Sequence, residues 1–165
     1  PLLTPFGVTL EAYSAGVPAE LMTSAGVRPC DSLKELFARS EVLFECEALT
    51  RATEQSVSAD VLAALPDDAV FVNIGRGGLV DDDALRREAA SGRIRVALDV
   101  ARGEPLTPAS PYVQMGHVVL SPHMAGPTLD RYKHCGAYAL ANLRSFLDGK
   151  TPPGAISLAA YDRAT

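Results

Sequence analysis

Polar side chains that could bind an anion and transfer a proton follow three successive apolar runs of this chain. Arg76 lies in a glycine-rich turn after the run 70–72, Asp99 lies near the end of the next run, and His123 follows the third. Short runs of β-branched and aromatic residues predict buried strands. Because the carboxyl ends of parallel strands meet at one edge of a sheet, these side chains are expected to lie close together. A guanidinium that binds a carboxylate, beside groups that exchange a proton, would form an anion-binding acid–base site.

Glu104, in the loop after the second of these strands, adds another carboxylate to this edge. Taken singly, each side chain has a simpler interpretation: Glu104 as an ordinary loop acid, His123 as a structural histidine and Arg76 as a solvated arginine. The arrival of all three at successive strand ends favours a shared site. His117 and His134 have no comparable surroundings, so structural or surface roles are expected for them.

Strands and helices alternate along the chain, which predicts an α/β fold with a doubly wound parallel sheet covered on both sides. Ser32, followed by Glu35, fits a capping box at the start of one helix. Ser58 and the acidic triplet 81–83 precede two more helices, and Gly92 fits a helix end. Strands are expected at 8–13, 42–47, 70–72, 95–100 and 117–120, and helices at 18–24, 33–40, 59–65, 84–91 and 127–147.

Length and composition fit one globular domain, with 165 residues, 47% hydrophobic and 21% charged. A net charge of −5, without a basic run, argues against a nucleic-acid partner. No apolar stretch reaches the roughly 18 residues of a membrane span, so no membrane partner is expected. Cys30, Cys46 and Cys135 form no metal-ligand pattern and predict reduced thiols in the cytoplasm. Because the chain opens with PLLTPFG rather than Met, it is expected to be part of a longer polypeptide.

Several motifs occur together in one order. They are VNIGRGGLVD at 72–81, ALDV at 97–100, GEP at 103–105 and SPHMAG at 121–126. In this combination they resemble the D-isomer-specific 2-hydroxyacid dehydrogenase family, and the resemblance extends to about Gly149. It implies a Rossmann-type dinucleotide-binding domain that uses NAD or NADP to interconvert a 2-oxo acid and a D-2-hydroxy acid.

The resemblance also implies roles for individual residues. Arg76 would bind the substrate carboxylate and carbonyl, His123 would donate the proton to the carbonyl oxygen, and Glu104 would be the partner of His123. A carboxylate beside an imidazole favours the protonated ring, which keeps an acid ready near neutral pH. Asp99 would lie near the nicotinamide carboxamide. The implied cofactor-binding positions are Ser14, Cys46, Glu47, Ile74, Gly75, Arg76, Asp99, His123, Ala125 and Gly126.

The chain departs from the family pattern in two ways. The G-x-G-x-x-G turn and its preceding strand are absent, and since that strand would lie in the middle of the sheet, a strand-wide gap is expected. Residues 1–126 are therefore interpreted as a truncated dinucleotide-binding domain, and 127–165 as a helix and tail leading to a substrate domain outside this chain. Ser14 replaces the acidic residue expected at the adenosine ribose, which leaves the choice between NAD and NADP open.

Other functions remain compatible with these motifs. Some members of the family act as dinucleotide-sensing corepressors, and phosphite oxidation is a further possibility. Glutamine stands at the position of Glu104 in formate-oxidising relatives, which argues against formate. The expected partners are a small 2-oxo or 2-hydroxy acid and a second copy in a homodimer. This part of the polypeptide is expected to be inactive alone.

Overall fold

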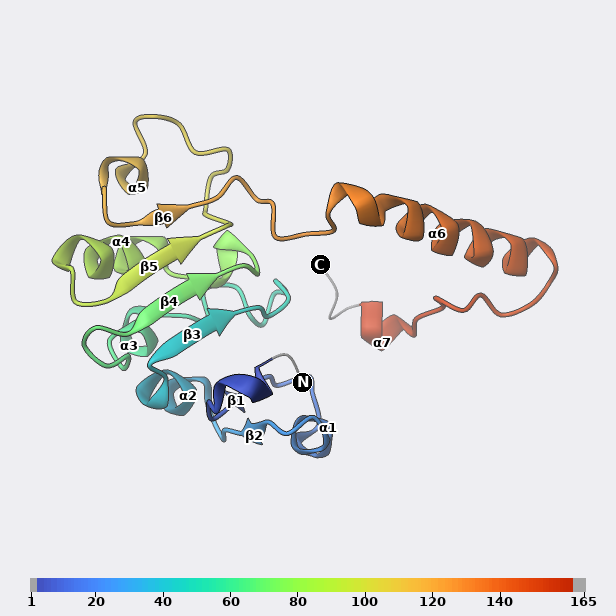
Figure 1. Ribbon diagram of the computed structural model, residues 1–165, viewed down its shortest axis with the longest axis horizontal. Coiled ribbons are helices and arrows are strands. Elements are labelled where there is room, and N and C mark those ends of the chain that lie inside the picture. Colours follow the sequence, from blue (N-terminus) through green and yellow to red (C-terminus); the bar gives the residue numbers. More distant parts are fainter. Residues whose placement is uncertain (1–2, 162–165) are drawn as a thin grey trace.

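Apolar runs at four places in the chain become the strands of one parallel sheet. The computed structural model describes residues 3–161. In register, Val42 pairs with Val70 and Val70 with Arg95, so all the strands run the same way and their carboxyl ends share one edge (Figure 1). This confirms the predicted parallel α/β fold. The strands, in spatial order, are β3 (Val42–Glu45), β4 (Val70–Asn73), β5 (Arg95–Leu98) and β6 (Val119–Leu120).

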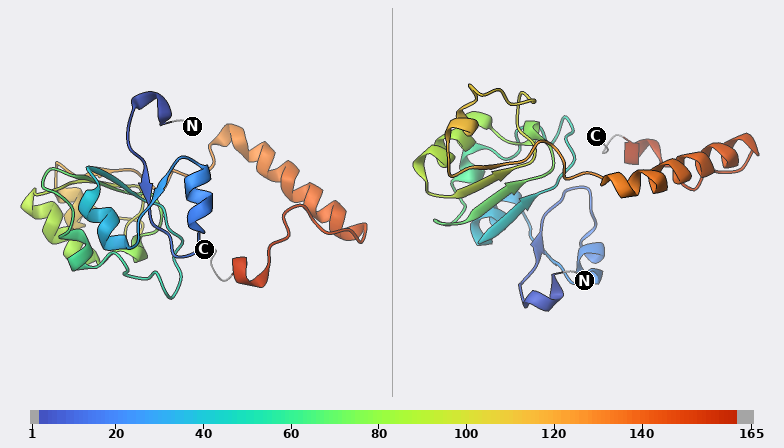
Figure 2. Two further views of the ribbon diagram at one scale, coloured as in Figure 1. Left: turned by 90° about the horizontal axis from the view of Figure 1, so that it is seen from below. Right: turned by 45° about the horizontal axis from the view of Figure 1, so that its top comes forward.

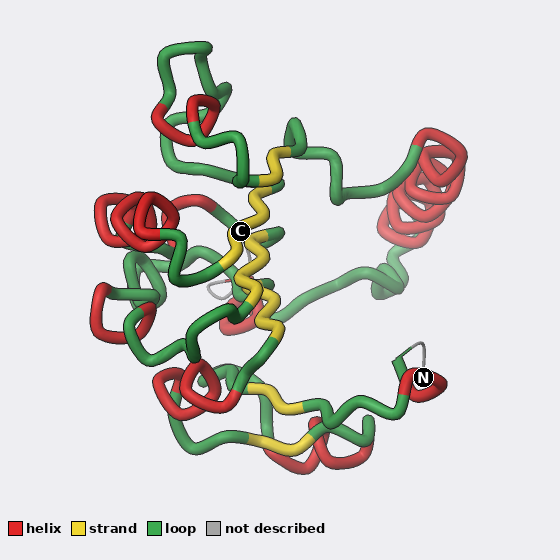
Figure 3. The backbone as a smooth tube through the Cα atoms, turned by 60° about the vertical axis from the view of Figure 1, so that its left-hand side comes forward, coloured by secondary structure: helices red, strands yellow, loops and turns green. Residues whose placement is uncertain are grey.

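Three helices lie together on one face of this sheet, as Figures 1 and 3 show. They are α2 (Leu33–Arg39), α3 (Ala59–Leu62) and α4 (Asp82–Ser91). Phe37 of α2 and Phe71 of β4 are fully buried against each other, with ring centroids 6.1 Å apart. Burial of each such side chain stabilises the fold by about 1.5–3 kcal/mol.

The opposite face of the sheet corrects one prediction from the sequence. Val42 and Phe44 of β3 remain 55% and 57% exposed, and none of the described helices covers them. Leu43, between them, is buried because successive side chains of a strand point to opposite faces. The apolar residues on both faces of β3 predicted helices on both faces, but within residues 3–161 only one face of β3 is covered.

Local signals fix the ends of α2 and α4. The Ser32 hydroxyl accepts a hydrogen bond from the Glu35 N–H at 3.1 Å, and the Asp81 carboxylate accepts one from the Ala84 N–H at 3.0 Å. Gly92 ends α4 in the left-handed conformation, with φ 72°. Ser58 occupies the expected N-cap position of α3, but its side chain makes no capping hydrogen bond.

A second, separate sheet precedes the first one. β1 (Glu11–Ala12) and β2 (Arg28–Pro29) pair in parallel, with α1 (Ala19–Ser24) between them in the chain. The described strands thus form two sheets, with β3 at an unpaired outer edge, which agrees with the gap expected in the middle of the sheet. The sequence did not predict β2, because two residues ending in proline carry almost no strand pattern.

The remaining elements differ modestly from expectation. In the sequence, Leu2-Leu3 and Phe6-Gly7 resemble the end of a helix. The structure has the short turn η1 (Thr4–Phe6) there, and residues 1 and 2 lie outside the described residues. A short helix, α5 (Pro111–Gln114), lies between β5 and β6, where no helix was expected. Pro127 was expected to begin the last long helix, but η3 (Leu129–Arg131) comes first. The other elements are η2 (Gly77–Leu79), α6 (Tyr132–Leu147) and α7 (Leu158–Tyr161).

Helix α6 projects away from the sheet, and the chain then turns back beside it (Figures 1 and 2). The Gly154 N–H donates a hydrogen bond to the Asn142 side-chain oxygen at 2.6 Å, which ties the returning segment to the helix. The apolar face that the sequence predicts includes Tyr132, Leu143 and Phe146, and each is more than half exposed. Within residues 3–161, no helix is both long enough and apolar enough to cross a membrane.

Glu45, at the end of β3, is a buried carboxyl that the fold tolerates at a cost. It is 6% exposed and accepts a hydrogen bond from the Glu47 N–H at 2.8 Å. Burial raises its pKa, and the hydrogen bond from Glu47 only partly offsets that effect. The pKa of Glu45 is higher in the folded protein than in the unfolded chain. The contribution of Glu45 to the free energy of unfolding is therefore highest at low pH, where Glu45 is protonated in both states, and it decreases as pH rises through the raised pKa.

We therefore predict that Glu45→Gln increases the free energy of unfolding at pH 7 by about 1 kcal/mol, or about 2–4 °C in Tm. The gain should become much smaller near pH 4, where the carboxyl is mostly protonated in both states. Thermal denaturation at the two pH values measures the difference. Glu41→Gln, at an exposed position before the same strand, is the control and should change little. An equal effect of Glu45→Gln at both pH values would contradict the prediction.

Candidate active site

The carboxyl ends of β4, β5 and β6 are joined to one another through their backbones. The Asp99 N–H donates to the Asn73 carbonyl at 3.0 Å, and the His123 N–H donates to the Asp99 carbonyl at 3.0 Å. The buried Asn73 side chain also shapes the glycine-rich turn, because it accepts from the Gly75 N–H at 3.1 Å and donates to the Arg76 carbonyl at 3.2 Å. The three polar strand ends predicted from the sequence therefore belong to one connected edge.

Gly77 explains why this turn contains glycine. A Cβ atom built there would lie 2.2 Å from the Ala101 carbonyl carbon and 2.4 Å from the Arg102 nitrogen. No side chain fits at such distances from backbone atoms. The absence of a side chain lets the turn that carries Arg76 pack directly against the loop that carries Glu104.

Glu104 and His123 form a hydrogen-bonded pair. The His123 Nδ1 and the Glu104 Oε2 atoms are 2.7 Å apart, and the Ala101 N–H donates to Glu104 Oε1 at 2.8 Å. Both carboxylate oxygens are therefore engaged, which holds the carboxylate in place. Because Nδ1 faces Glu104, Nε2 is the ring nitrogen that remains for a substrate. The predicted hydrogen-bonding distance between these two side chains is confirmed.

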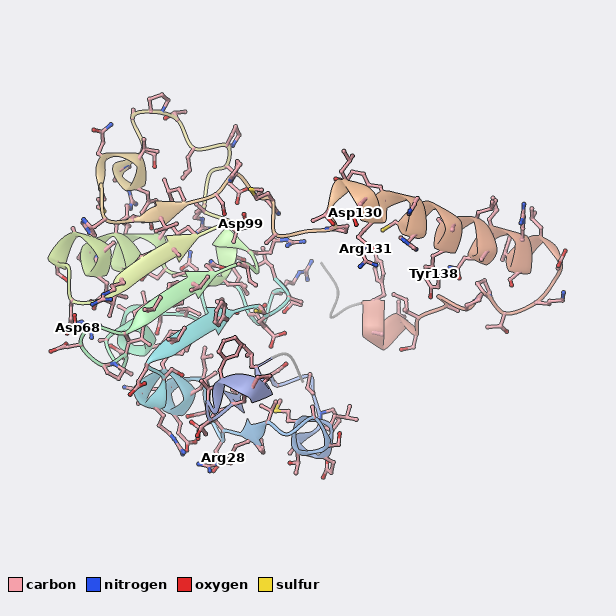
Figure 4. All side chains as sticks on the ribbon, in the orientation of Figure 1. Arg28, Asp68, Asp99, Asp130, Arg131 and Tyr138 are labelled. Carbon is pink, nitrogen blue, oxygen red and sulfur yellow. The ribbon has the colours of Figure 1, made fainter. Side chains whose placement is uncertain are left out.

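Asp99 directly follows β5, at the carboxyl edge of the sheet (Figure 4). Its Oδ1 accepts hydrogen bonds from the Ser121 hydroxyl at 2.6 Å and the Met124 N–H at 2.8 Å, and its Oδ2 accepts one from the Ala125 N–H at 2.9 Å. Burial alone would raise the pKa of Asp99, but these hydrogen bonds and the nearby His123 outweigh burial and lower it. Asp99 is thus an ionised carboxylate enclosed by donors.

Arg76 occupies the neighbouring strand end but does not join this network. Its Nη1 donates to the Gly75 carbonyl at 2.8 Å. Among the described residues it has no hydrogen bond to Glu104 or His123. The structure therefore connects Glu104, His123 and Asp99, whereas the partly exposed Arg76 is not among the residues that line the cleft beside them.

A cleft of about 480 Å³ opens next to the Glu104–His123 pair. Its acidic and basic groups are Asp99, Glu104 and His123, and most of the remaining wall is apolar. An apolar wall with a few polar groups at one end is the usual composition of a small-molecule site. The apolar residues include Leu98, Leu106, Leu120 and Pro122.

The other predicted cofactor positions lie on two separate parts of the structure. Cys46 and Glu47 follow β3, and Ile74 and Gly75 follow β4, so these four share the carboxyl edge of the sheet. A Cβ atom on Gly75 would lie 3.1 Å from the Glu47 carbonyl oxygen, which shows how closely the two loops approach. Ser14 instead follows β1 in the separate sheet.

The positions at the carboxyl edge of the sheet, without Ser14, could accommodate the nicotinamide end of a dinucleotide. Ile74 is 39% exposed at the sheet edge and offers an apolar surface to a planar ring. Ala125 and Gly126 continue the turn beyond His123 at the same edge. Sequence reasoning missed Asn73, Ser121 and Met124, which shape the site through hydrogen bonds with the backbone or with Asp99.

The parallel sheet, its helices and the polar groups at its carboxyl edge define a Rossmann-like dinucleotide-binding domain. The family profile described as "D-isomer specific 2-hydroxyacid dehydrogenase, NAD binding domain" matches residues 1–125. The chain belongs to this family.

Individual relatives agree with this assignment. Glyoxylate reductase from Aeropyrum pernix is 33% identical over 153 residues, which cover 92% of this chain and 45% of that protein. D-3-phosphoglycerate dehydrogenase from Methanocaldococcus jannaschii is 29% identical over 154 residues, which cover 93% of this chain and 29% of that protein. A crystal structure of a D-isomer specific 2-hydroxyacid dehydrogenase from Xanthobacter autotrophicus Py2, in complex with NADPH and MES, superposes with a TM-score of 0.81 at 30% identity. The superposition covers 94% of this chain and 63% of that chain. The chain thus spans less than half the length of these two curated relatives.

Proposed function

We propose that this chain is the dinucleotide-binding part of an NAD(P)-dependent D-2-hydroxyacid dehydrogenase that reduces a small 2-oxo acid. The observation that carries the proposal is the 2.7 Å contact between His123 and Glu104 at the carboxyl edge of the sheet. When bound, the nicotinamide supplies a hydride to C2 of the substrate. His123 donates the proton that the carbonyl oxygen then needs, so the 2-oxo group becomes a hydroxyl group.

Each of the other side chains prepares this proton transfer. Glu104 accepts a hydrogen bond from the Nδ1–H of His123, which orients the ring and leaves Nε2 free to face the substrate. Arg76, on the adjacent loop, can bind the planar substrate carboxylate through two parallel N–H donors. Binding the carboxylate in this way fixes which face of the carbonyl is presented for reduction.

The relatives support a small substrate and either cofactor. The A. pernix relative is named for glyoxylate, the smallest 2-oxo acid, and the X. autotrophicus relative was crystallised with NADPH. We propose Cys46, Glu47, Ile74, Gly75, Ala125 and Gly126 as cofactor contacts at the sheet edge, with Ser14 at the adenosine ribose.

Ser14 leads to a prediction about cofactor choice. A hydroxyl can form a hydrogen bond with the ribose, but it lacks the charge that would repel a 2′-phosphate. We expect the complete polypeptide to discriminate between NADH and NADPH by only about tenfold in kcat/KM, equivalent to roughly 1.4 kcal/mol. Steady-state kinetics with both cofactors measures the ratio. A preference for NADH of about a thousandfold would show that another residue selects the cofactor.

The proposal includes a larger protein around this chain. The unpaired edge of β3 and the exposed apolar face of α6 are surfaces that further polypeptide would cover, with 127–165 leading to a substrate domain. We propose that residues 3–161 alone lack activity because the other wall of the substrate site lies in that domain. The homodimer and the cytoplasmic location stay predictions.

A panel of 2-oxo acids assayed with NADH and NADPH, using the complete polypeptide that contains this sequence, tests the proposed function. We expect turnover of at least one small 2-oxo acid. Dinucleotide binding without any turnover would favour a corepressor-like sensor instead. Oxidation of phosphite in the same assay, without reduction of any 2-oxo acid, would favour the phosphite alternative.

A further inference from the structure

We propose that Asp99 is a positioning residue that holds His123 in place for proton transfer, an inference that rests on the proposed function. The family resemblance implies that this carboxylate lies near the nicotinamide carboxamide. In the structure, Asp99 accepts hydrogen bonds from the turn that carries His123.

The donors surround His123 in the chain. Ser121 precedes it by two residues, and Met124 and Ala125 are the two residues that follow it. Asp99 accepts a hydrogen bond from each of the three at 2.6–2.9 Å. Its backbone carbonyl also accepts the His123 N–H at 3.0 Å. One residue therefore restrains the turn on both sides of the imidazole.

The turn needs such restraint because its backbone is strained. His123 has φ +51°, in the left-handed region that residues with a side chain rarely adopt. That conformation costs about 1 kcal/mol or more and persists only where the surroundings enforce it. Since χ1 directions follow the backbone, loss of this conformation would move the ring away from Glu104.

Counting acceptors supports an internal role for Asp99. An ionised carboxylate offers about four acceptor positions, and three are occupied by the turn. The residue is also only 7% exposed. At most one acceptor position remains for a ligand, so most of the hydrogen-bonding capacity of Asp99 serves the turn.

The test compares Asp99→Asn with the same substitution at Asp68 in the complete polypeptide. Asparagine preserves shape, but its amide nitrogen cannot accept from the Met124 or Ala125 N–H. Asp68 is a suitable control, because it is also an aspartate next to a strand of the sheet, its side chain is 85% exposed, and it lies at the opposite edge of the sheet (Figure 4).

We expect Asp99→Asn to lower kcat by about 10–100-fold, as for loss of a group that orients a catalytic residue, and to change the Kd for NADH less than threefold. Hydrogen exchange in a peptide spanning 121–126 should accelerate in Asp99→Asn and not in Asp68→Asn. Ser121→Ala, which removes a single donor, should show the same pattern more weakly and keeps the test available if Asp99→Asn does not fold.

A large rise in the NADH Kd with unchanged kcat and unchanged exchange at 121–126 would overturn the proposal and assign Asp99 to the cofactor. Absence of turnover in the unsubstituted protein would instead overturn the proposed function, and with it any catalytic role of Asp99. Hydrogen exchange distinguishes the two failures, because it reports on the turn whether or not the protein turns over a substrate.

Discussion

Replacing His123 with alanine is expected to lower kcat for 2-oxo acid reduction by about 10²–10⁴-fold, the usual contribution of a positioned general acid. The reason is that His123 is the proposed proton donor; it lines the cleft and contacts Glu104 at 2.7 Å. Steady-state kinetics of the complete polypeptide, with the substrate found in the panel assay, gives the value. The Kd for the cofactor should change far less than kcat.

His134→Ala is the control for this substitution. His134 is exposed on α6, away from the sheet edge, so its loss should leave kcat unchanged. Near-normal reduction by His123→Ala would remove the proposed proton donor and with it the mechanism.

Replacing Arg76 with lysine is expected to lower kcat/KM by about 10–100-fold, corresponding to the loss of a hydrogen bond to a charged group. Lysine keeps the positive charge but loses the planar pair of donors that binds a carboxylate and sets its orientation. Both KM and kcat should therefore worsen, because binding and alignment depend on the same contact.

Arg95→Lys provides the comparison. Arg95 begins β5 at the opposite edge of the sheet, and its side chain is 73% exposed. Its substitution should have no kinetic effect. If Arg76→Lys changed kcat and KM as little as Arg95→Lys does, the substrate carboxylate would have to bind to another residue.

The sequence predicted the central part of the fold because two kinds of signal agree there. The apolar run before the glycine-rich turn indicated β4, and the motifs around Glu104 and His123 indicated which strand ends belong together. A parallel sheet then brings those ends to one edge without further information. The Glu104–His123 contact was predictable for this reason.

Other features could not be predicted because they depend on contacts outside any local pattern. β2 has two residues, and α5 has a single turn, so neither has a detectable period. The hydrogen bonds to Asp99 come partly from backbone N–H groups, which every residue except proline carries and which therefore leave no mark in a sequence. The exposure of α6 could not be predicted either. An apolar helix face indicates that another segment packs against it, but it does not indicate which segment of the polypeptide that is.

Transfer of a deuterium label tests the central claim most directly. The complete polypeptide is incubated with a small 2-oxo acid and nicotinamide cofactor deuterated at the transferred position, and the product is analysed for label and configuration. Hydride transfer to C2 on one face predicts a D-2-hydroxy acid with deuterium at C2, formed by the unsubstituted protein and nearly abolished in His123→Ala. A product without deuterium at C2, or no cofactor-dependent product from any 2-oxo acid in the panel, would contradict the account.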